Sequence, residues 1–279
     1  MNKLRWSVAG LIFIFGACNG GGVDEGPGEI FDRSVGGTST GNGLVMAAVS
    51  TASNDGAVET RDRGGLVFLL DSIRAHAEEV EITLPAGVSC ADLDMVTALS
   101  ATCEPEDDGD SGDELNLAGG FVFDMLTRTV EPSLDSLALP AIRVSEVEVA
   151  FAPADEDEGV VSPADPLSER TVRATGRFDY EGQSRDLVVE LDFEGEVAFE
   201  NENGVAIDAE QAIDLILQFD VADWLASLPI QECLDDGDLV LVGNTLTLTG
   251  GDGECGDVPG GIVTAITTSG DLEVDIDDD

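Results

Sequence analysis

The sequence has very few basic residues and almost no histidine. Twelve lysines and arginines stand against 58 aspartates and glutamates, which gives a formal net charge of −46 at pH 7. Such a charge repels phosphate backbones, so nucleic-acid binding through a basic surface is excluded. Because Lys3 is the one lysine, the phosphate-cradling P-loop motif with its essential lysine cannot occur. His76 is the one histidine, which leaves little for imidazole-based metal or proton-transfer chemistry.

Aromatic residues are also scarce, at 5% of the chain. A glycosidase needs two carboxylates, which 58 acidic residues readily supply, but there are few aromatic platforms for sugar rings. Ala-Glu-Glu follows His76, so there is no HExxH zinc motif, and a serine hydrolase would have His76 as its only candidate base. The alternation around His76 predicts an exposed strand residue. We therefore expect a non-enzymatic protein, with a carboxylate-based hydrolase as the alternative.

The apolar run near the N-terminus is too short to cross a membrane as a helix. Residues 7–15 are apolar or small, whereas a span needs about 20 such residues. Lys3 and Arg5 precede this run, and Gly16 and Ala17 follow it directly before Cys18. This order is typical of a cleaved export signal. The glycine-rich stretch after Cys18 indicates a flexible tether rather than a first strand.

Phe15-Gly16-Ala17-Cys18 resembles the lipobox of bacterial lipoproteins, in which small residues precede an invariant cysteine, although Phe15 stands where leucine is usual. The resemblance implies cleavage before Cys18, diacylglycerol on its thiol and acylation of its new amino group. Acyl chains contribute about 0.8 kcal/mol per buried methylene, so several of them anchor a protein stably in a membrane. Asn19 is not the aspartate that commonly marks inner-membrane retention, which implies the outer membrane or cell surface. The body resembles uncharacterised envelope lipoproteins, from which no activity can be carried over.

Four cysteines remain after Cys18, and they fall into two local pairs, Cys90 with Cys103 and Cys233 with Cys255. Four cysteines allow three connectivities, of which the two short loops are favoured. Each bridge would add about 3 kcal/mol through loop-closure entropy. There is no CxxC spacing, and the implied compartment is oxidising, so disulfides are favoured over a four-cysteine metal site.

From Leu44 onward, apolar and polar residues alternate in short blocks that Gly, Pro and Asp clusters separate. This pattern predicts an all-β fold, an antiparallel β-sandwich with a bulge near Glu78-Glu79. One short helix is expected at 221–228, with Asp220 as its cap. The later strands are expected at 239–242, 246–248 and 262–266.

The expected organisation has four parts. Residues 1–17 form the signal peptide, 18–43 the flexible acidic tether, 44–271 the β-sandwich and 272–279 an acidic tail. The sandwich is either one large domain or two fused smaller ones that split near 131–136.

The best-determined element is a hairpin at 171–193, with Glu181 and Gly182 at the centre of its turn. This register places Arg173 opposite Glu190 and Arg177 opposite Asp186, while the other face is apolar. The arginine cluster would suit an anionic ligand, but cross-strand ion pairs explain it, and we prefer that structural interpretation.

Calcium is the most plausible ligand, because acidic loops with glycine offer the hard oxygen atoms that it needs. The best candidate comprises Asp107, Asp108, Asp110, Asp113 and Glu114. Further acidic runs lie at 155–158 and 235–238, and none of the three fits the spacing of an EF-hand loop. The sequence therefore predicts an envelope lipoprotein with a binding or structural role towards a protein or glycan, or else a calcium-stabilised surface adhesin.

Overall fold

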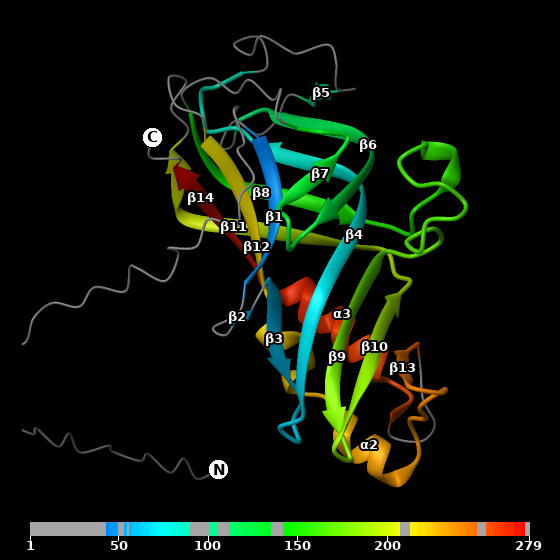
Figure 1. Cartoon of the computed structure of the whole chain (residues 1–279). Coiled ribbons are helices and arrows are strands. Elements are labelled where there is room, and N and C mark those ends of the chain that lie inside the picture. The colour runs from blue at the N-terminus through cyan, green and yellow to red at the C-terminus, as the bar shows by residue number, and fades with distance from the viewer. Residues whose placement is uncertain are drawn as a thin grey trace, which may run out of the picture. The chain divides into compact units, whose positions relative to one another are not determined.

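The computed structural model describes residues 43–49, 53–54, 56–89, 101–104, 112–134, 142–206, 213–249 and 255–276. They all lie within one compact unit, Val35–Asp279 (Figure 1). Most of this backbone is β-strand and the helices are short, so the prediction of an all-β fold is confirmed. No helix in the described part of the chain is long and apolar enough to cross a membrane.

Two sheets make up the unit. The large sheet comprises β2 (Ser53–Asn54), β3 (Ala57–Arg61), β4 (Val67–Thr83), β5 (Ala101–Glu104), β6 (Glu114–Asp124), β7 (Thr129–Glu131), β8 (Arg143–Phe151), β9 (Val172–Tyr180), β10 (Gln183–Leu191), β11 (Gly195–Ala206) and β13 (Thr245–Leu248). The small sheet has the order β1 (Gly43–Val49), β12 (Ile213–Asp220), β14 (Gly270–Ile276). The α-helices are α1 (Ala222–Ala226), α2 (Ile230–Asp236) and α3 (Val258–Thr268).

Antiparallel pairing dominates, as expected for a sandwich, and two pairs are parallel. β1 pairs in parallel with β12, and β10 pairs in parallel with β13. The partners of each parallel pair are far apart in the sequence, so no hairpin signal reveals them. Apolar alternation indicates which side of a strand is buried, but it does not indicate the direction of the neighbouring strand.

β4 is the longest strand, and it pairs with β3, β6, β8 and β9. Its register against β6 and β8 shifts between Ala77 and Glu79, which confirms the predicted bulge. Ala75 and Ala77 are buried before the bulge, and Val80 and Ile82 are buried after it. The extra residue therefore keeps the apolar side chains of both halves of β4 on the same inner face.

The small sheet packs against the inner face of the large sheet, and aromatic rings form the contact. The ring of Phe219 on β12 lies 5.1 Å from that of Phe199 on β11 and 6.2 Å from that of Phe151 on β8. Trp224 of α1 closes the group at 6.1 Å from Phe219. One buried cluster extends through both sheets and includes residues on both sides of 131–136.

The hairpin of β9 and β10 has the predicted register throughout. Tyr180 pairs with Gln183, Arg177 with Asp186, and Arg173 with Glu190. Glu181 and Gly182 adopt φ angles of 52° and 72°, as a two-residue type I′ turn requires. Nε of Arg173 lies 3.5 Å from Oε1 of Glu190, so the structural interpretation of this pair is confirmed.

The helix expected at 221–228 is present as α1. Its N-cap residue is Val221 rather than the expected Asp220, whose Oδ1 accepts a hydrogen bond from the Ala222 amide at 2.9 Å. A second helix, α2, follows directly after Pro229. The strand expected at 239–242 is wrong, because Val240 and Val242 are 67% and 80% exposed and only an isolated bridge joins Val242 to Thr245.

The strand expected at 262–266 is also wrong, because these residues belong to α3. The buried residues of α3 are Val258, Ile262 and Ile266, which are spaced four apart. A spacing of four satisfies both the two-residue period of a strand and one face of a helix, so alternation alone could not distinguish them. β14 then extends to Ile276, beyond the expected domain end at residue 271.

Candidate functional site: a glutamate-covered face of the large sheet

Outward-facing glutamates gather over five neighbouring strands of the large sheet, in the order β5, β6, β4, β8 and β11. Strand alternation places them there: on β4, Glu79 and Glu81 flank the fully buried Val80, so both side chains point away from the core. We call this surface the glutamate face. Its members are Glu79, Glu81, Glu104, Glu114, Glu146, Glu148, Glu196 and Glu200.

The strand registers bring these glutamates beside one another. The pairs of glutamates that lie directly opposite across two strands are Glu81–Glu148, Glu146–Glu200 and Glu104–Glu114. Opposite residues have their Cβ atoms about 4.5–5.5 Å apart, and like charges in such positions destabilise a sheet. The registers therefore bring like charges opposite one another at three cross-strand pairs on one surface.

Burial and neighbouring negative charges raise the pKa values of two central carboxyls, those of Glu81 and Glu148. Partial burial raises the pKa of Glu81, and so do the charges of neighbouring glutamates, Glu79 first. Partial burial raises the pKa of Glu148, followed by the charges of Glu196 and Glu81 and a hydrogen bond with Glu196. The neighbouring charges that raise these two pKa values all belong to other glutamates.

The spacing of the carboxylates determines what this surface can bind. Neighbouring strands lie about 4.8 Å apart, and residues on one side of a strand repeat about every 6.8 Å. A chelated metal ion needs several oxygens within about 2.6 Å of one point. Within the described ranges no group of three acidic, histidine or cysteine residues is close enough to hold a metal ion. The glutamate face is therefore an extended anionic surface rather than a chelating pocket.

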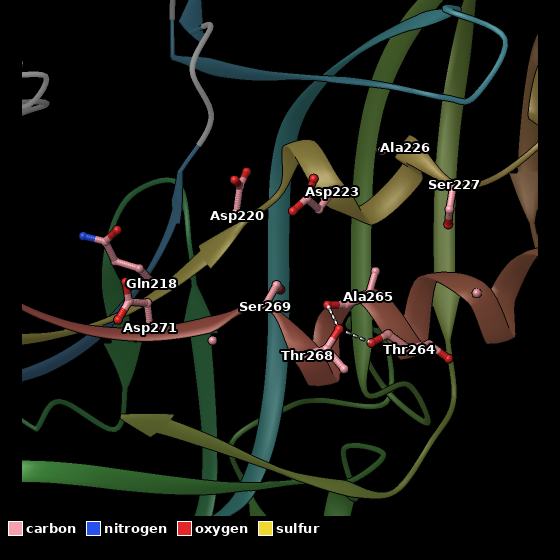
Figure 2. Close-up of a pocket in the computed structure, with 12 residues that line it drawn as sticks. Gln218, Asp220, Asp223, Ala226, Ser227, Thr264, Ala265, Thr268, Ser269 and Asp271 are labelled. Atoms are coloured by element: carbon pink, nitrogen blue, oxygen red, sulfur yellow. Dashed lines mark hydrogen bonds between the residues drawn. The ribbon is translucent and has the colours of Figure 1, made fainter. Parts of the chain in front are cut away.

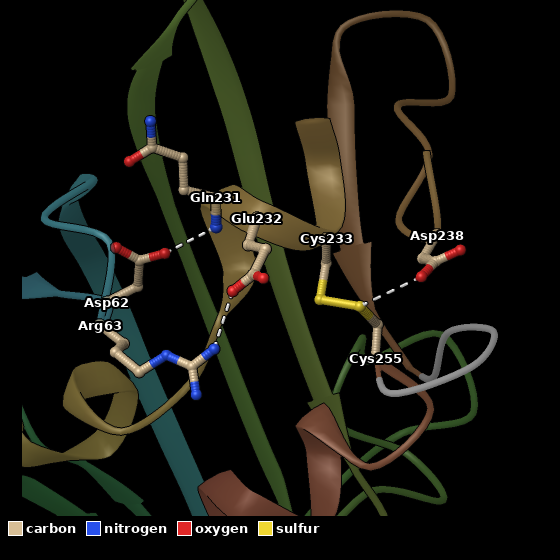
Figure 3. The surroundings of a disulfide bond; sticks show 7 residues. All are labelled: Asp62, Arg63, Gln231, Glu232, Cys233, Asp238 and Cys255. Atoms are coloured by element: carbon tan, nitrogen blue, oxygen red, sulfur yellow. Dashed lines mark hydrogen bonds and ion pairs between the residues drawn. A yellow bond between two sulfur atoms is a disulfide. The ribbon is translucent and has the colours of Figure 1, made fainter. Parts of the chain in front are cut away.

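One predicted disulfide is present in the structure. Cys233 on α2 and Cys255 before α3 are bonded, with their Cα atoms 5.9 Å apart (Figure 3). Oδ2 of Asp238 lies 3.7 Å from Sγ of Cys255. Cys103 on β5 is also disulfide-bonded. Its expected partner Cys90 and the lipidation candidate Cys18 lie outside the described residues.

A buried aspartate beside this disulfide has a structural role. Asp62 is 5% exposed, and its Oδ1 and Oδ2 accept hydrogen bonds from the backbone amides of Leu66 at 2.8 Å and Gln231 at 2.6 Å. Arg63 adds an ion pair with Glu232 at 2.8 Å (Figure 3). These contacts join the β3–β4 turn to α2, and both oxygens of Asp62 are occupied by the backbone.

Two members of the predicted calcium loop, Asp113 and Glu114, lie within the described residues. Asp107, Asp108 and Asp110 lie outside the described residues. The backbone carbonyl of Asp113 accepts a hydrogen bond from Leu84, and Glu114 begins β6 as part of the glutamate face.

The two other acidic runs form helix ends. Residues 156–158 are the 3-10 turn η2 (Glu156–Glu158), in which Asp155 accepts a hydrogen bond from the Asp157 amide. Residues 235–238 close α2, where Gly237 adopts φ 80°. Their acidic and glycine residues are those that helix caps favour.

The prediction that His76 is exposed is wrong, because its side chain is fully buried. Alternation correctly placed His76 on the outer side of β4. It could not show that the connection between β8 and β9, residues 152–171, covers this part of the outer side. The backbone amide of His76 donates to the carbonyl of Thr171 at 2.8 Å, at the end of that connection.

An open groove of about 780 Å³ lies between α1, α3 and the adjoining ends of β12 and β14 (Figure 2). Its polar lining comprises Gln218, Asp220, Asp223, Ser227, Thr264, Thr268, Ser269 and Asp271. The hydroxyls of Thr264 and Thr268 donate to carbonyls within α3. Oδ1 of Asp271 accepts a hydrogen bond from the Leu272 amide. Among the described residues lining the groove there is no aromatic ring, histidine or basic side chain. Its ionisable side chains are all aspartates.

Sequence reasoning missed the glutamate face, although a signal for it was present. Glutamate alternates with apolar residues in three segments, at 79–82, 146–149 and 196–200. Each segment by itself reads as a strand with a solvated side. Only the registers of β4, β8 and β11 show that the three charged sides adjoin.

Comparison with known proteins gives no relative for this chain. No protein-family model matches it, no curated protein matches its sequence, and no solved structure matches its fold. The function must therefore be inferred from the chain's own residues.

Proposed function

We propose that the chain is a lipid-anchored protein of the bacterial cell envelope with a non-enzymatic binding role. Its binding surface is the glutamate face, and its partner is a basic segment of another protein. The observation that supports this proposal is the set of eight glutamates on one sheet surface, three pairs of which lie directly opposite across neighbouring strands, with the pKa of Glu81 raised by burial and by the charges of nearby glutamates. A sheet surface whose charges served only to keep the protein soluble would not need like charges directly opposite one another.

A lysine- or arginine-rich segment fits this surface by charge and by shape. An extended peptide spaces alternate side chains about 6.8 Å apart, which matches the repeat of Glu79 and Glu81 along β4. Each exposed ion pair contributes about 0.2–1 kcal/mol, so affinity would come from several pairs acting together. The anionic field would also accelerate association and make it sensitive to salt.

The anchoring part of the proposal is supported by the N-terminal sequence, in which Lys3 and Arg5 precede an apolar run, two small residues and Cys18. Metabolic labelling with palmitate in a bacterial host should mark the full-length chain. Cys18→Ser should abolish the label and release the protein from the membrane fraction. An unlabelled wild-type chain in the culture medium would refute the anchor and leave the binding surface to be tested separately.

The binding part is tested with a decalysine peptide as the probe and isothermal titration calorimetry as the measurement. The variant Glu81→Gln/Glu148→Gln/Glu196→Gln should weaken binding about tenfold at low salt, because it removes three adjacent charges at the centre of the face. The matched control Glu156→Gln/Glu169→Gln/Glu181→Gln removes the same charge from exposed positions elsewhere. Equal weakening in both triple variants would show that only net charge matters and would contradict a specific surface.

A further inference from the structure

The large sheet ends at β13, which pairs with β10 and with no other strand of the described chain (Figure 1). The segment before it, residues 239–242, which we call the arm, turns back at Gly243 and Asn244 and runs antiparallel to β13. The isolated bridge between Val242 and Thr245 joins the two. The arm is therefore placed to be the next strand of the sheet, yet it pairs with β13 at this bridge alone.

Backbone groups show that β13 has an open edge beyond this bridge. The carbonyl of Asn244 accepts a hydrogen bond from the Asp186 amide of β10 at 3.0 Å, whereas Thr245 exchanges both its backbone hydrogen bonds with Val242, at 2.9 and 3.2 Å. Successive residues of a strand direct their N–H and C=O groups to opposite sides, so those of Thr247 also point away from β10. No backbone group in the described ranges bonds to them. Such groups are a template for an added strand.

The arm is fixed elsewhere and leaves this edge unfilled. In a regular antiparallel pair, Val240 and Thr247 would be the next residues to exchange hydrogen bonds, and they do not. The buried Leu239 instead donates its amide hydrogen to the carbonyl of Cys233 at 3.0 Å. Cys233 is in turn bonded to Cys255 (Figure 3). The disulfide thus holds the arm to α2, so little ordering is needed when the edge binds a partner.

The side chains beside the edge are apolar or uncharged and accessible. Val240 and Val242 are 67% and 80% exposed, and they are the exposed large hydrophobic residues of the described chain. Thr247 is exposed on β13, and the half-buried Val188 lies opposite it on β10. All four residues are β-branched, the type that packs well on a strand surface. We call the outward backbone groups of Thr247, together with Val240 and Val242, the open edge.

Acidic residues surround the open edge. The hydroxyl of Tyr180 donates to Asp235 at 2.9 Å, so the tip of the β9–β10 hairpin lies beside α2. The charged residues of these two elements and the start of the arm are Asp179, Glu181, Asp186, Asp235, Asp236 and Asp238, against Arg177 and Arg185. This excess of negative charge favours a partner with lysine or arginine. It disfavours an anionic lipid surface and a second copy of this chain, whose net charge is −46.

We propose that the open edge binds an extended segment of another protein, which adds to the large sheet as a strand. The segment carries apolar β-branched residues at alternate positions and basic residues at its ends. Hydrogen bonds with the backbone of Thr247 supply affinity, and contacts with Val240 and Val242 supply specificity. The open edge shares no residue with the glutamate face, so this inference does not depend on the function proposed for that face.

Fluorescence anisotropy of two labelled peptides with the full-length chain tests the proposal. One peptide alternates threonine and valine between pairs of lysines, and the other has proline in place of each threonine. Proline has no backbone N–H, so the second peptide cannot add to a sheet edge. Both peptides carry the same lysines, so attraction to acidic surfaces elsewhere is common to both. The first should bind at least about tenfold more tightly, and equal affinities would overturn the proposal.

Substitutions then locate the binding. Thr247→Pro removes the outward N–H of β13 and leaves the hydrogen bonds with β10 in place, so it should weaken binding of the threonine–valine peptide about tenfold. Thr247→Val keeps that N–H and is the matched control, with wild-type affinity expected. Val240→Ser/Val242→Ser should also weaken binding, because it removes the apolar contact. Wild-type affinity in both Thr247→Pro and the double valine variant would refute the open edge as the site.

Hydrogen exchange supplies a readout that needs no substitution. The amide of Thr247 should become protected about tenfold or more when the threonine–valine peptide saturates the chain. The amide of Thr245 already bonds to Val242 and should change little. Unchanged exchange at Thr247 would overturn the proposal even where Thr247→Pro fails to fold.

Two further measurements test the other occupants. Sedimentation velocity should show a monomer, and the Cys18→Ser chain should not bind phosphatidylcholine vesicles. A dimer that Val240→Ser/Val242→Ser dissociates would place a second copy on the open edge. Vesicle binding that the same double substitution abolishes would place a lipid surface there. Either result would overturn the proposal.

Discussion

The outer side of the large sheet divides at the β4 bulge into a covered half and a bare half. In the covered half, Arg74 and His76 lie beneath the β8–β9 connection, and each faces a carboxylate of that connection. In the bare half, beyond the bulge, Glu79 and Glu81 lie among six further glutamates. The inner side is apolar along the whole of β4. The two halves therefore share one core but differ in how their charges are compensated.

This difference indicates which charges the fold needs. Charges in the covered half connect two elements, so removing one partner should loosen a contact. Charges in the bare half lie close to other negative charges, and the hydrogen bonds there include one from Asn116 to Glu79 and one between Glu148 and Glu196. Residues that lower stability without making a compensating structural contact are candidates for a role in function.

The largest loss of stability is expected from truncating a side chain in the small apolar cluster that holds the β8–β9 connection over the covered half. Leu167 is fully buried in the small cluster with Val122, Ala154 and Val161. Leu167→Ala should lower the free energy with which the connection stays closed by about 2–4 kcal/mol, because it leaves a cavity there. Hydrogen exchange at the Ala154 and Glu169 amides measures this effect. Unchanged protection would mean that the apolar cluster does not hold the connection.

A smaller effect is expected from the ion pair in the same half. The hydrogen bond from Arg74 lowers the pKa of Asp165 below its ordinary value of 3.8. A lowered carboxyl pKa stabilises the fold above that ordinary value, and the contribution is lost as the pH falls through the lower folded-state value. Asp165→Asn should cost about 0.5–1 kcal/mol at pH 7, after allowance for solvent screening. Urea unfolding at pH 7 and about pH 2 measures the difference, which should vanish in acid.

The smallest expected effect is an increase in the free energy of unfolding, and it comes from substitutions in the bare half. The pKa values of Glu81 and Glu148 are raised above 4.5, so the fold binds protons more readily than the unfolded chain does. The contribution of these two groups to stability is therefore greatest below pH 4.5 and falls as the pH rises through the raised values. Glu81→Gln/Glu148→Gln should increase the free energy of unfolding at pH 7 by about 0.5 kcal/mol.

Urea unfolding at pH 7 and about pH 3 checks this gain, which should disappear in acid because both carboxyls are then protonated in either state. Glu156→Gln, in the exposed turn η2, is the control and should change little. A loss of stability in the double variant at pH 7 would contradict the view that these glutamates repel one another.

Much of the fold could be read from the sequence where local pattern determines structure. The β9–β10 register follows from Glu181-Gly182 and the alternation on either side, and the β4 bulge follows from the phase change after Ala77. The Cys233–Cys255 bridge follows from cysteine number and spacing. In each case the interacting residues are close in sequence, so short-range patterns carry the information.

The features that were predicted wrongly or missed depend instead on contacts between residues far apart in the sequence. Ile262 and Ile266 fit strand and helix periods equally, and the contacts of α3 with α1 and β11 are not contained in that pattern. His76 was placed on the correct side of β4, but a connection about 80 positions later covers it. The glutamate face likewise exists only through pairing between distant strands. Its members could be recognised as outward-facing from sequence, but not as neighbours.

The parallel pairing of β1 with β12 has a consequence for the order of assembly. Gly43 finds its partner, Asp214, roughly 170 positions later, and β12 is in turn completed by β14 at the end of the described chain. Closing so long a loop is entropically costly, and contacts of this range slow folding. During synthesis β1, the first strand of the described residues, therefore has no β12 to pair with until more than three quarters of the printed sequence has been made, so the small sheet is expected to close late.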